Sequence, residues 1–383
     1  MYTEKRYRSF RILFILAGNP LMGDGQSVAY RMYSIAIATI YYVCWVGEVI
    51  ETFMHLDNPE EMLESARIAI PISACIWIDA FTRFRKHSID NLIRLTESFV
   101  FEDCPERDAS TGRLTTAGMI PWIQKLTILG TCLVLGPHSI YMFVRSIGTE
   151  KLGLRMWTPY DARPSPVHEI TVIIQVLSTL VDVTIFTGFV GLYATLVAIA
   201  CTQLEKLQEG LKNFRNEKEL KPNTEQEKLK EHIRFHQSIL SFMGALEDTL
   251  NILVLGHFLV IVGALCFGVI SAVAIWGNAG DLLQIILVMC SITAQLGMYC
   301  WFGERLTNQA EGVKQAVWES EWVGAPLQQQ RDLAFVMAEA NKQFVLTAGG
   351  FTSLSHHTLI MVANQVMSYT MFLVNVRDEN DRA

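Results

Sequence analysis

The 383-residue sequence contains little charge: Asp, Glu, Lys and Arg make up only 18% of it, whereas 51% is hydrophobic. This proportion of apolar residues exceeds what one water-soluble core usually buries, so we expect part of the chain to lie in lipid. The formal net charge is −7, and the charges gather between long apolar stretches. Nothing in this balance indicates a nucleic-acid partner.

The sequence also lacks the marks of an extracellular domain. Six of its eight cysteines lie inside apolar stretches, and it has no Asn-x-Ser/Thr glycosylation acceptor. No framework of external disulfides is therefore available. The apolar run Ile12–Ala17 is too short for a secretory signal and lacks a cleavage site of small residues, so we expect the amino terminus to stay in the cytoplasm.

Enzyme motifs are absent as well. The sequence has no Gly-rich phosphate loop, no paired-cysteine motif and no helical His-Glu metal pair. His356 and His357 are adjacent, so on a helix their side chains point about 100° apart and do not share one ligand face. We expect a protein that is not an enzyme and that uses no metal and no cofactor.

Long apolar stretches dominate the chain. A helix needs about 20 residues to cross the hydrocarbon core, and six stretches meet that length. A seventh, Leu346–Val374, is interrupted by Ser, Thr, His, Asn and Gln, and a helix this polar should not face lipid. The sequence therefore predicts an all-α bundle of seven transmembrane helices. The six clear stretches are Val28–Phe53, Met62–Phe81, Ile120–Phe143, Ile170–Cys201, Leu250–Trp276 and Leu282–Phe302.

The orientation of the bundle follows from its basic residues, which are retained on the cytoplasmic side. One set of connecting segments holds 22 Lys and Arg residues and the opposite set holds 6. This bias predicts a cytoplasmic amino terminus and an extracellular carboxyl terminus. It disfavours a G-protein-coupled receptor, which needs an external amino terminus, and we find no related halves of the kind common in secondary transporters.

Helical periodicity continues into the cytoplasmic segments. Leucines and phenylalanines recur at three-to-four spacing at Leu204, Leu207, Leu211 and Phe214, and again, more loosely, from Leu240 to Leu250. We expect these helices to project below the membrane and to bury their apolar stripes in a cytoplasmic helical anchor region, with the loop between them at Lys221–Thr224. The predicted parts are a cytoplasmic segment 1–27, four transmembrane helices with half of the ligand pocket in 28–201, two further helices with the anchor in 202–345, and the seventh helix with a short extracellular tail in 346–383.

Four blocks of the sequence resemble the insect odorant receptor family, and specifically its ligand-tuning subunits. They are MWTPYDARPSPVHEITVIIQ (Met156–Gln175), HQSILSFMGALEDTLN (His236–Asn251), YCWFGERLTNQAEGVKQAVWESEW (Tyr299–Trp322) and LTAGGFTSLSHHTLIMVANQVMSYTMFL (Leu346–Leu373). The chain is less similar to the gustatory receptors, whose tail has a different motif, and to the shared co-receptor, which has a longer loop after the fourth span. A seven-helix G-protein-coupled or gustatory-type chemoreceptor is the alternative.

The resemblance implies an odorant-gated, nonselective cation channel in the plasma membrane of an olfactory neuron dendrite. It implies a heteromeric, tetrameric assembly with the co-receptor subunit, a small volatile hydrophobic or aromatic odorant as ligand, and a pore lined by the seventh helix. In this sequence one face of that helix carries a mixed stripe at three-to-four spacing. Simple hydrogen bonding between helices is the alternative role for its polar members. The stripe consists of Met361, Gln365, Ser368, Phe372 and Val376.

The resemblance also places the odorant pocket in the outer half of the bundle, among the second to sixth helices. A mostly apolar cage with few hydroxyls suits a small volatile, although each of these residues is equally consistent with ordinary helix packing. Asp182, inside the fourth span, either joins an interhelical hydrogen bond or borders the pocket. The candidate ligand residues are Ile72, Cys75, Gly136, Ser139, Ile140, Met142, Thr171, Ile174, Ser178, Phe267, Ser271 and Ile285.

Overall fold

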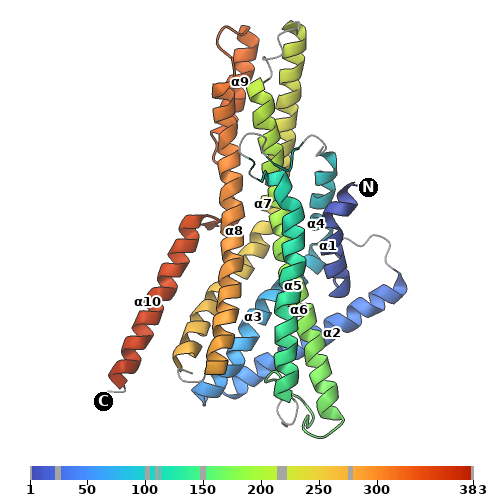
Figure 1. Ribbon diagram of the computed structural model, residues 1–383, viewed down its shortest axis with the longest axis vertical. Helices are drawn as coiled ribbons and strands as arrows, with labels where there is room; N and C mark the ends of the chain where they lie inside the picture. The colour runs from blue at the N-terminus through green and yellow to red at the C-terminus, as the bar shows by residue number, and fades with distance from the viewer. Residues whose placement is uncertain are drawn as a thin grey trace.

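The computed structural model describes residues 2–21, 27–99, 104–107, 112, 114–146, 152–213, 222–274 and 279–380. In these ranges the chain forms an elongated bundle of long helices with one short strand pair (Figure 1). The helices are α1 (Tyr2–Leu16), α2 (Val28–Met54), α3 (Pro59–Phe84), α4 (Lys86–Leu95), the single-turn helix η1 (Thr96–Ser98), α5 (Thr116–Ser146), α6 (Val167–Asn213), α7 (Pro222–Ala274), α8 (Ala279–Glu319), α9 (Leu327–Ala340) and α10 (His356–Asn380); the strands are β1 (Thr347–Ala348) and β2 (Thr352–Ser353).

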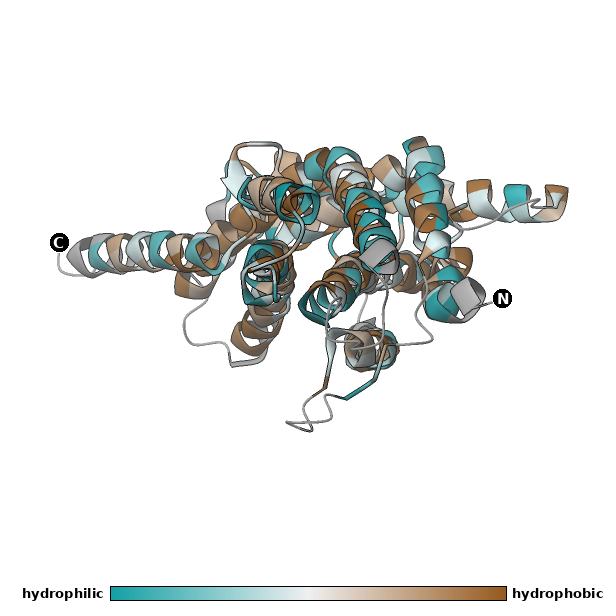
Figure 2. Ribbon diagram, turned by 90° about the horizontal axis from the view of Figure 1, so that it is seen from above, coloured by the Kyte–Doolittle hydropathy of each residue, from teal (hydrophilic) through white to brown (hydrophobic). Residues whose placement is uncertain are grey.

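Seven of these helices form the transmembrane bundle. Among the described residues, six of them (α2, α3, α5, α6, α7 and α8) are long and apolar enough to cross a membrane. The six clear sequence stretches fall on these helices, which confirms the prediction. The seventh is α10, which is more polar and extends away from the other helices when the bundle is viewed along its long axis (Figure 2).

The predicted start of the seventh helix was wrong. Leu346 does not begin a helix, because β1 and β2 pair here in an antiparallel hairpin with Thr347 opposite Ser353. Gly349 and Gly350 turn the chain at φ values of 63° and 76°, a left-handed conformation that favours glycine. The helix therefore starts only at His356.

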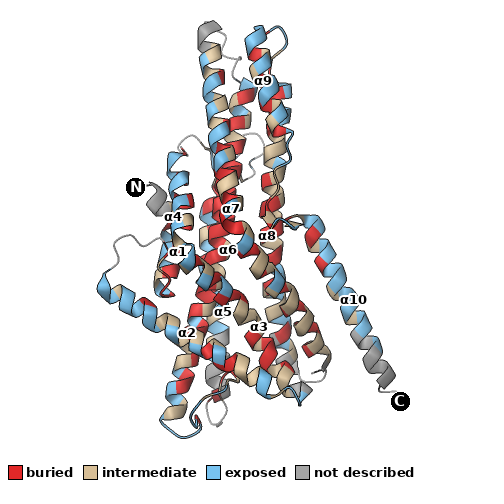
Figure 3. Ribbon diagram, turned by 180° about the vertical axis from the view of Figure 1, so that it is seen from behind, coloured by how far each residue is buried: buried red, intermediate tan, exposed pale blue. Residues whose placement is uncertain are grey.

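The core of the bundle is α6, which is buried along most of its length (Figure 3). The stretch Leu192–Leu204 is buried without interruption. Small residues explain how the neighbouring helices approach so closely: a Cβ atom on Gly191 would collide with Phe10 of α1 and Thr127 of α5. The sequence therefore places small side chains where three helices meet.

A buried polar network fixes the cytoplasmic end of the first helices. Asp79 of α3 is fully buried, and its carboxylate accepts hydrogen bonds from Asn19 Nδ2 (2.7 Å), Tyr42 Oη (3.0 Å) and Arg83 Nε (2.6 Å). Arg83 also donates to Ser34 Oγ and to the Gly18 carbonyl, each at 3.0 Å. The network joins the segment after α1 to α2 and α3, and so holds α1 against the bundle.

The cytoplasmic ends of α6, α7 and α8 project beyond the other helices, and α9 folds back along α8 (Figure 1). Leu204, Leu207 and Leu211 are fully buried, as the periodicity predicts, whereas Phe214 lies outside the described residues. Lys221 also lies outside them, and Pro222, which the sequence assigned to the loop, begins α7. These projections form the predicted helical anchor.

Close packing at Gly191 predicts a large effect of added volume. We expect Gly191→Val to destabilise the protein by about 1–3 kcal/mol, because the side chain overpacks the junction of α1, α5 and α6. Thermal unfolding in detergent measures the change. Gly130→Val on α5 is the matched control, since a Cβ atom there meets nothing within 4 Å. Equal melting temperatures for the two variants would contradict the packing argument.

Candidate functional site

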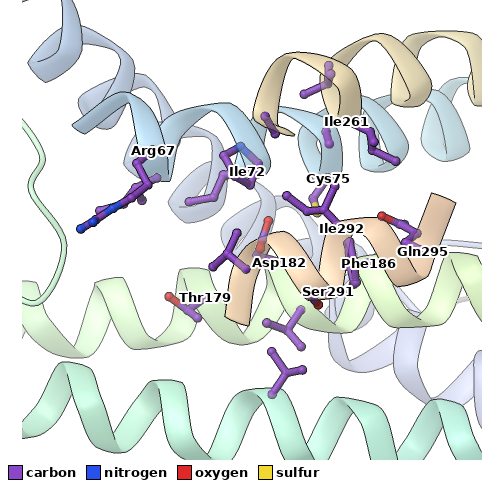
Figure 4. A pocket seen from close by; sticks show the side chains of 18 of the residues that line it. Arg67, Ile72, Cys75, Thr179, Asp182, Phe186, Ile261, Ser291, Ile292 and Gln295 are labelled. Carbon is purple, nitrogen blue, oxygen red and sulfur yellow. The ribbon is translucent and has the colours of Figure 1, made fainter. Parts of the chain in front are cut away.

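A cavity of about 170 Å³ lies among α3, α5, α6, α7 and α8, in the outer half of the bundle (Figure 4). Its wall is mostly aliphatic and includes Ile72, Val183 and Ile261, with Phe186 as its aromatic member. A small number of polar side chains interrupts the wall. An apolar hollow with few polar groups is the usual form of a small-molecule site. The polar lining residues are Arg67, Ser178, Thr179, Asp182, Ser291 and Gln295.

The external loop closes one side of the cavity. Leu154 of this loop lines the cavity, and both of its backbone groups bond to Gln175 of α6. The Leu154 amide donates to Gln175 Oε1 at 3.2 Å, and Gln175 Nε2 donates to the Leu154 carbonyl at 2.8 Å. The loop is also bonded to α2, because the Trp157 amide donates a hydrogen bond to the Gly47 carbonyl at 3.0 Å. The loop is therefore fixed above the cavity by two helices.

Asp182 makes an interhelical hydrogen bond and also lines the cavity. Its carboxylate accepts a hydrogen bond from Tyr41 Oη of α2 at 2.8 Å and also interacts with the Cys75 thiol of α3. At the same time Asp182 lines the cavity. An interhelical hydrogen bond and a place in the cavity wall are thus compatible, because the carboxylate sits where α2, α3 and α6 meet.

The deep end of the cavity is formed by α8. Gln295 Nε2 donates to Tyr299 Oη at 3.3 Å, which orients the amide, and the Gln295 side chain also interacts with His257. The buried ring of His257 stacks edge-on against Tyr299 with centroids 5.7 Å apart. Gln295 therefore lines the cavity with an amide whose orientation is set by Tyr299 and His257.

Three of the candidate ligand residues line this cavity: Ile72, Cys75 and Ser178. Phe267 and Ile285 line a smaller hollow of about 10 Å³ beside it, which shares Arg67 and other wall residues with the main cavity. The structure thus brings five predicted residues to two adjoining spaces.

The other candidates lie elsewhere, and their role stays a prediction. On α5, Gly136 is exposed with open space around it, Ser139 is half-buried and Ile140 is 66% exposed; the side chain of Met142 lies outside the described residues. On α6, Thr171 is buried beside Tyr160 Oη (3.1 Å) and Ile174 is half-buried; Ser271 of α7 is buried.

Sequence reasoning missed Arg67 and the α8 residues Ser291, Ile292 and Gln295. One signal for Arg67 was present, since a charged residue inside an apolar span marks a functional candidate. No sequence signal marked the cavity-lining residues of α8, because polar side chains occur on several faces of that helix.

The predicted pore stripe lies on a helix that packs only at its base. Met361, Gln365, Ser368 and Phe372 are exposed on α10, Phe372 by 63%, and the side chain of Val376 lies outside the described residues. At the base of α10, the His356 amide donates to Glu304 Oε2 of α8 at 2.6 Å, and the Thr347 amide donates to Glu247 Oε2 of α7 at 3.0 Å. Beyond its base, α10 stands clear of the bundle (Figure 1).

The seven membrane helices, the apolar cavity among them and the last helix that leaves the bundle beyond its base are features that known proteins share. A family model described as "7tm Odorant receptor" matches residues 58–367. This chain is an odorant receptor by family. Insect odorant receptors are also its relatives in sequence and in structure.

Curated relatives of this odorant receptor include proteins of Drosophila melanogaster and Anopheles gambiae. It is 27% identical over 231 residues to odorant receptor 82a of Drosophila melanogaster, covering 59% of each chain, and 20% identical over 350 residues to odorant receptor 30a of the same species, covering 88% of this chain and 89% of that one. It is 24% identical over 149 residues to the odorant receptor coreceptor of Anopheles gambiae, covering 39% of this chain and 31% of the coreceptor. The match to odorant receptor 82a spans about three fifths of that relative's length.

The solved structure of olfactory receptor OR5 from Machilis hrabei in complex with eugenol has the same fold. Its TM-score with this odorant receptor is 0.77 at 14% sequence identity, and the alignment covers 97% of this chain and 98% of that one. Identity this low establishes the fold alone.

The loop above the cavity gives a local prediction for this odorant receptor. Gln175→Leu removes both hydrogen bonds to Leu154 and leaves two buried backbone groups unpaired, which should cost about 1–3 kcal/mol locally. Hydrogen exchange of the loop should then become faster by roughly tenfold or more. Mass spectrometry of peptides from residues 152–166 measures this exchange rate. Gln237→Leu, at an exposed cytoplasmic position, is the control. An unchanged rate of hydrogen exchange in the loop of Gln175→Leu would contradict the claim that these two hydrogen bonds hold the loop in place.

Proposed function

We propose that this odorant receptor is the odorant-binding tuning subunit of a heteromeric, odorant-gated, nonselective cation channel in the plasma membrane. The apolar cavity carries this proposal, since its mostly aliphatic wall offers a small volatile molecule dispersion contacts. An engineered cavity of about 150 Å³ accepts benzene, so a cavity of about 170 Å³ suits ligands of a similar, slightly larger size.

The ligand site we propose consists of the cavity wall, including Ile72, Cys75 and Ser178, with Asp182 and Gln295 as polar neighbours. Phe267 and Ile285 border the adjoining hollow and would meet a larger ligand. Gly136, Ser139, Ile140, Met142, Thr171, Ile174 and Ser271 remain candidates for indirect effects through their helices.

The pore we propose is lined by α10 of each subunit. Exposure of Met361, Gln365 and Ser368 supports this role, because an exposed mixed face needs either water or another subunit beside it. Phe372 and Val376, four residues apart on one face, would form the apolar constriction near the outer mouth.

The path from the cavity to the pore runs along α8. Gln295 and Glu304 are separated by about 14 Å of helix, and Glu304 holds the first amide of α10. A ligand that displaces α8 at Gln295 therefore moves the support of the pore helix. Such a change requires a ligand that binds the open arrangement more tightly than the closed one.

A co-receptor subunit is the partner we propose, in a complex of four subunits at the dendrite of an olfactory neuron. The resemblance of the block Leu346–Leu373 to the ligand-tuning subunits supports the tuning role. The division of the chain into 1–27, 28–201, 202–345 and 346–383 remains part of this proposal, with the seventh helix itself starting at His356.

The experiment that tests this function compares the chain alone with the chain plus co-receptor. We expect odorant-evoked cation current only on co-expression, because the co-receptor supplies the remaining pore helices. Whole-cell recording with a broad odorant panel measures the current, and surface labelling reports delivery to the membrane. Robust odorant-evoked current from this chain in cells without any co-receptor would contradict the assignment.

The cavity makes a sharper prediction about ligand preference. Ser178→Leu fills part of the cavity and should weaken responses to the bulkier odorants by roughly tenfold or more while leaving surface expression intact. Gly130→Leu is the matched control, because Gly130 of α5 has no atoms within 4 Å of a Cβ position. Dose–response curves across the panel compare the odorant preference of the two variants. If Ser178→Leu keeps the parental order and sensitivity of the responses, the ligand binds elsewhere.

A further inference from the structure

The external loop carries an ionic contact beside the cavity. Leu154 of this loop lines the cavity, and the next residue, Arg155, faces two carboxylates at the start of α3. Arg155 Nε lies 3.4 Å from Glu64 Oε2, and Arg155 Nη1 lies 3.5 Å from Glu61 Oε2. The contact with Glu61 is long, and Arg155 Nη1 makes no hydrogen bond in the described part of the chain. The loop is thus attached to α3 by a contact that is not at its full strength.

His55, the residue that follows α2, holds the same carboxylate oxygen more closely. His55 Nε2 lies 3.1 Å from Glu61 Oε2, and His55 Nδ1 lies 2.9 Å from the backbone carbonyl oxygen of Glu51. The Glu51 carboxylate lies 3.6 Å from the same Nδ1 atom. Both ring nitrogens therefore face acceptor oxygens. A neutral imidazole has only one N–H group, so this arrangement suits the protonated ring.

Glu61 is shared by two cations when His55 is protonated. Like charges repel, so the proton on His55 weakens the attraction between Glu61 and Arg155. Loss of the proton frees Glu61 Oε2 to accept a charge-assisted hydrogen bond from Arg155 Nη1. The other charged residues near this ring in the described part of the chain are acidic, and they favour its protonation. They are Glu51, Asp57 and Glu64.

We propose that His55 is a proton-binding residue that controls how firmly the external loop is held above the cavity. The protonated ring keeps Glu61 and leaves Arg155 with Glu64, whereas the neutral ring releases Glu61 to Arg155 and so fixes the loop to α3. Acid therefore loosens the loop over the mildly acidic range in which histidine gains its proton. An effect on the passage of a ligand rests on the proposed function, but the change in the loop does not.

Hydrogen exchange of the full chain in detergent tests the proposal. Each variant is compared with the parental chain at the same pH, so the intrinsic pH dependence of exchange cancels. His55→Phe keeps a ring that never carries a proton. At a pH of about 5.5 we expect loop peptides from residues 152–166 to exchange about two- to fivefold faster in the parental chain than in His55→Phe, the usual worth of an exposed ion pair. At a pH of about 8 the two rates should agree.

The turn between α2 and α3 should respond in the opposite direction. Peptides from residues 54–62 should exchange more slowly in the parental chain than in His55→Phe at the acidic pH, because the protonated ring joins the Glu51 carbonyl to Glu61. Opposite changes in two neighbouring segments distinguish this mechanism from a general loss of stability, which would make both segments exchange faster in the variant.

Controls isolate the contribution of His55. His87→Phe, at an exposed position of α4, is the matched control and should exchange like the parental chain in both segments. His168 Nδ1 lies 3.1 Å from the Ala162 carbonyl oxygen of the loop, but His168 is present in every variant, so its own titration cancels. His55→Gln, which is also uncharged, replaces His55→Phe if that variant does not fold. Equal loop exchange in the parental chain and the uncharged variant at the acidic pH, or slower exchange in the parental chain, would overturn the proposal.

The readout requires no odorant, no co-receptor and no current. A co-expressed channel at the cell surface that opens to no odorant refutes the proposed function and leaves the role of His55 standing. A loop whose exchange does not depend on His55 refutes this role in a channel that still opens to odorants.

Discussion

The structure depends on one constraint: the hydrocarbon of a membrane offers no hydrogen-bond partner, so polar groups inside it have to bond to each other. Asp79 shows the result, because its buried carboxylate is bonded by Asn19, Tyr42 and Arg83 from three separate parts of the chain. The same constraint explains why Gln175 bonds both backbone groups of Leu154, and why Asp182 bonds Tyr41. Polar residues thus connect helices that apolar packing alone would leave free to rotate.

Much of the fold could be predicted because long apolar runs and basic loops are strong signals. Six spans and the orientation follow from them. The helix α1 could not be predicted in this way: its buried residues Tyr7, Phe10 and Phe14 pack on α6, but the apolar run of its sequence is short. The hairpin before α10 was also missed, since hydropathy does not register the backbone conformation of Gly349 and Gly350.

The site was predictable only in part. Periodicity shows which residues share a helix face, but not toward which neighbour that face is rotated. On α3 the face with Ile72 and Cys75 turns toward the cavity, whereas on α5 the face with Gly136 and Ile140 turns outward. The contribution of α8 depends on where α6 and α7 leave space, which is a property of the packed bundle and not of any one helix. Arg67 was readable as an anomaly, because a charged residue inside an apolar span is unusual, yet its place in the cavity wall appears only in three dimensions.

The attachment of α10 at its base has a mechanical consequence. Its first amide is fixed to Glu304, the hairpin before it is fixed to Glu247, and Val362 and Val366 pack with the core, while the part of the helix beyond them leaves the bundle. A helix of 25 residues is about 37 Å long. Held at one end, it acts as a lever: a tilt of about 5° at the base displaces the far end by about 3 Å, roughly the width of a water molecule. In the channel we propose, small shifts of α8 beneath this pivot would be amplified at the far end of α10 without any change in the helix itself.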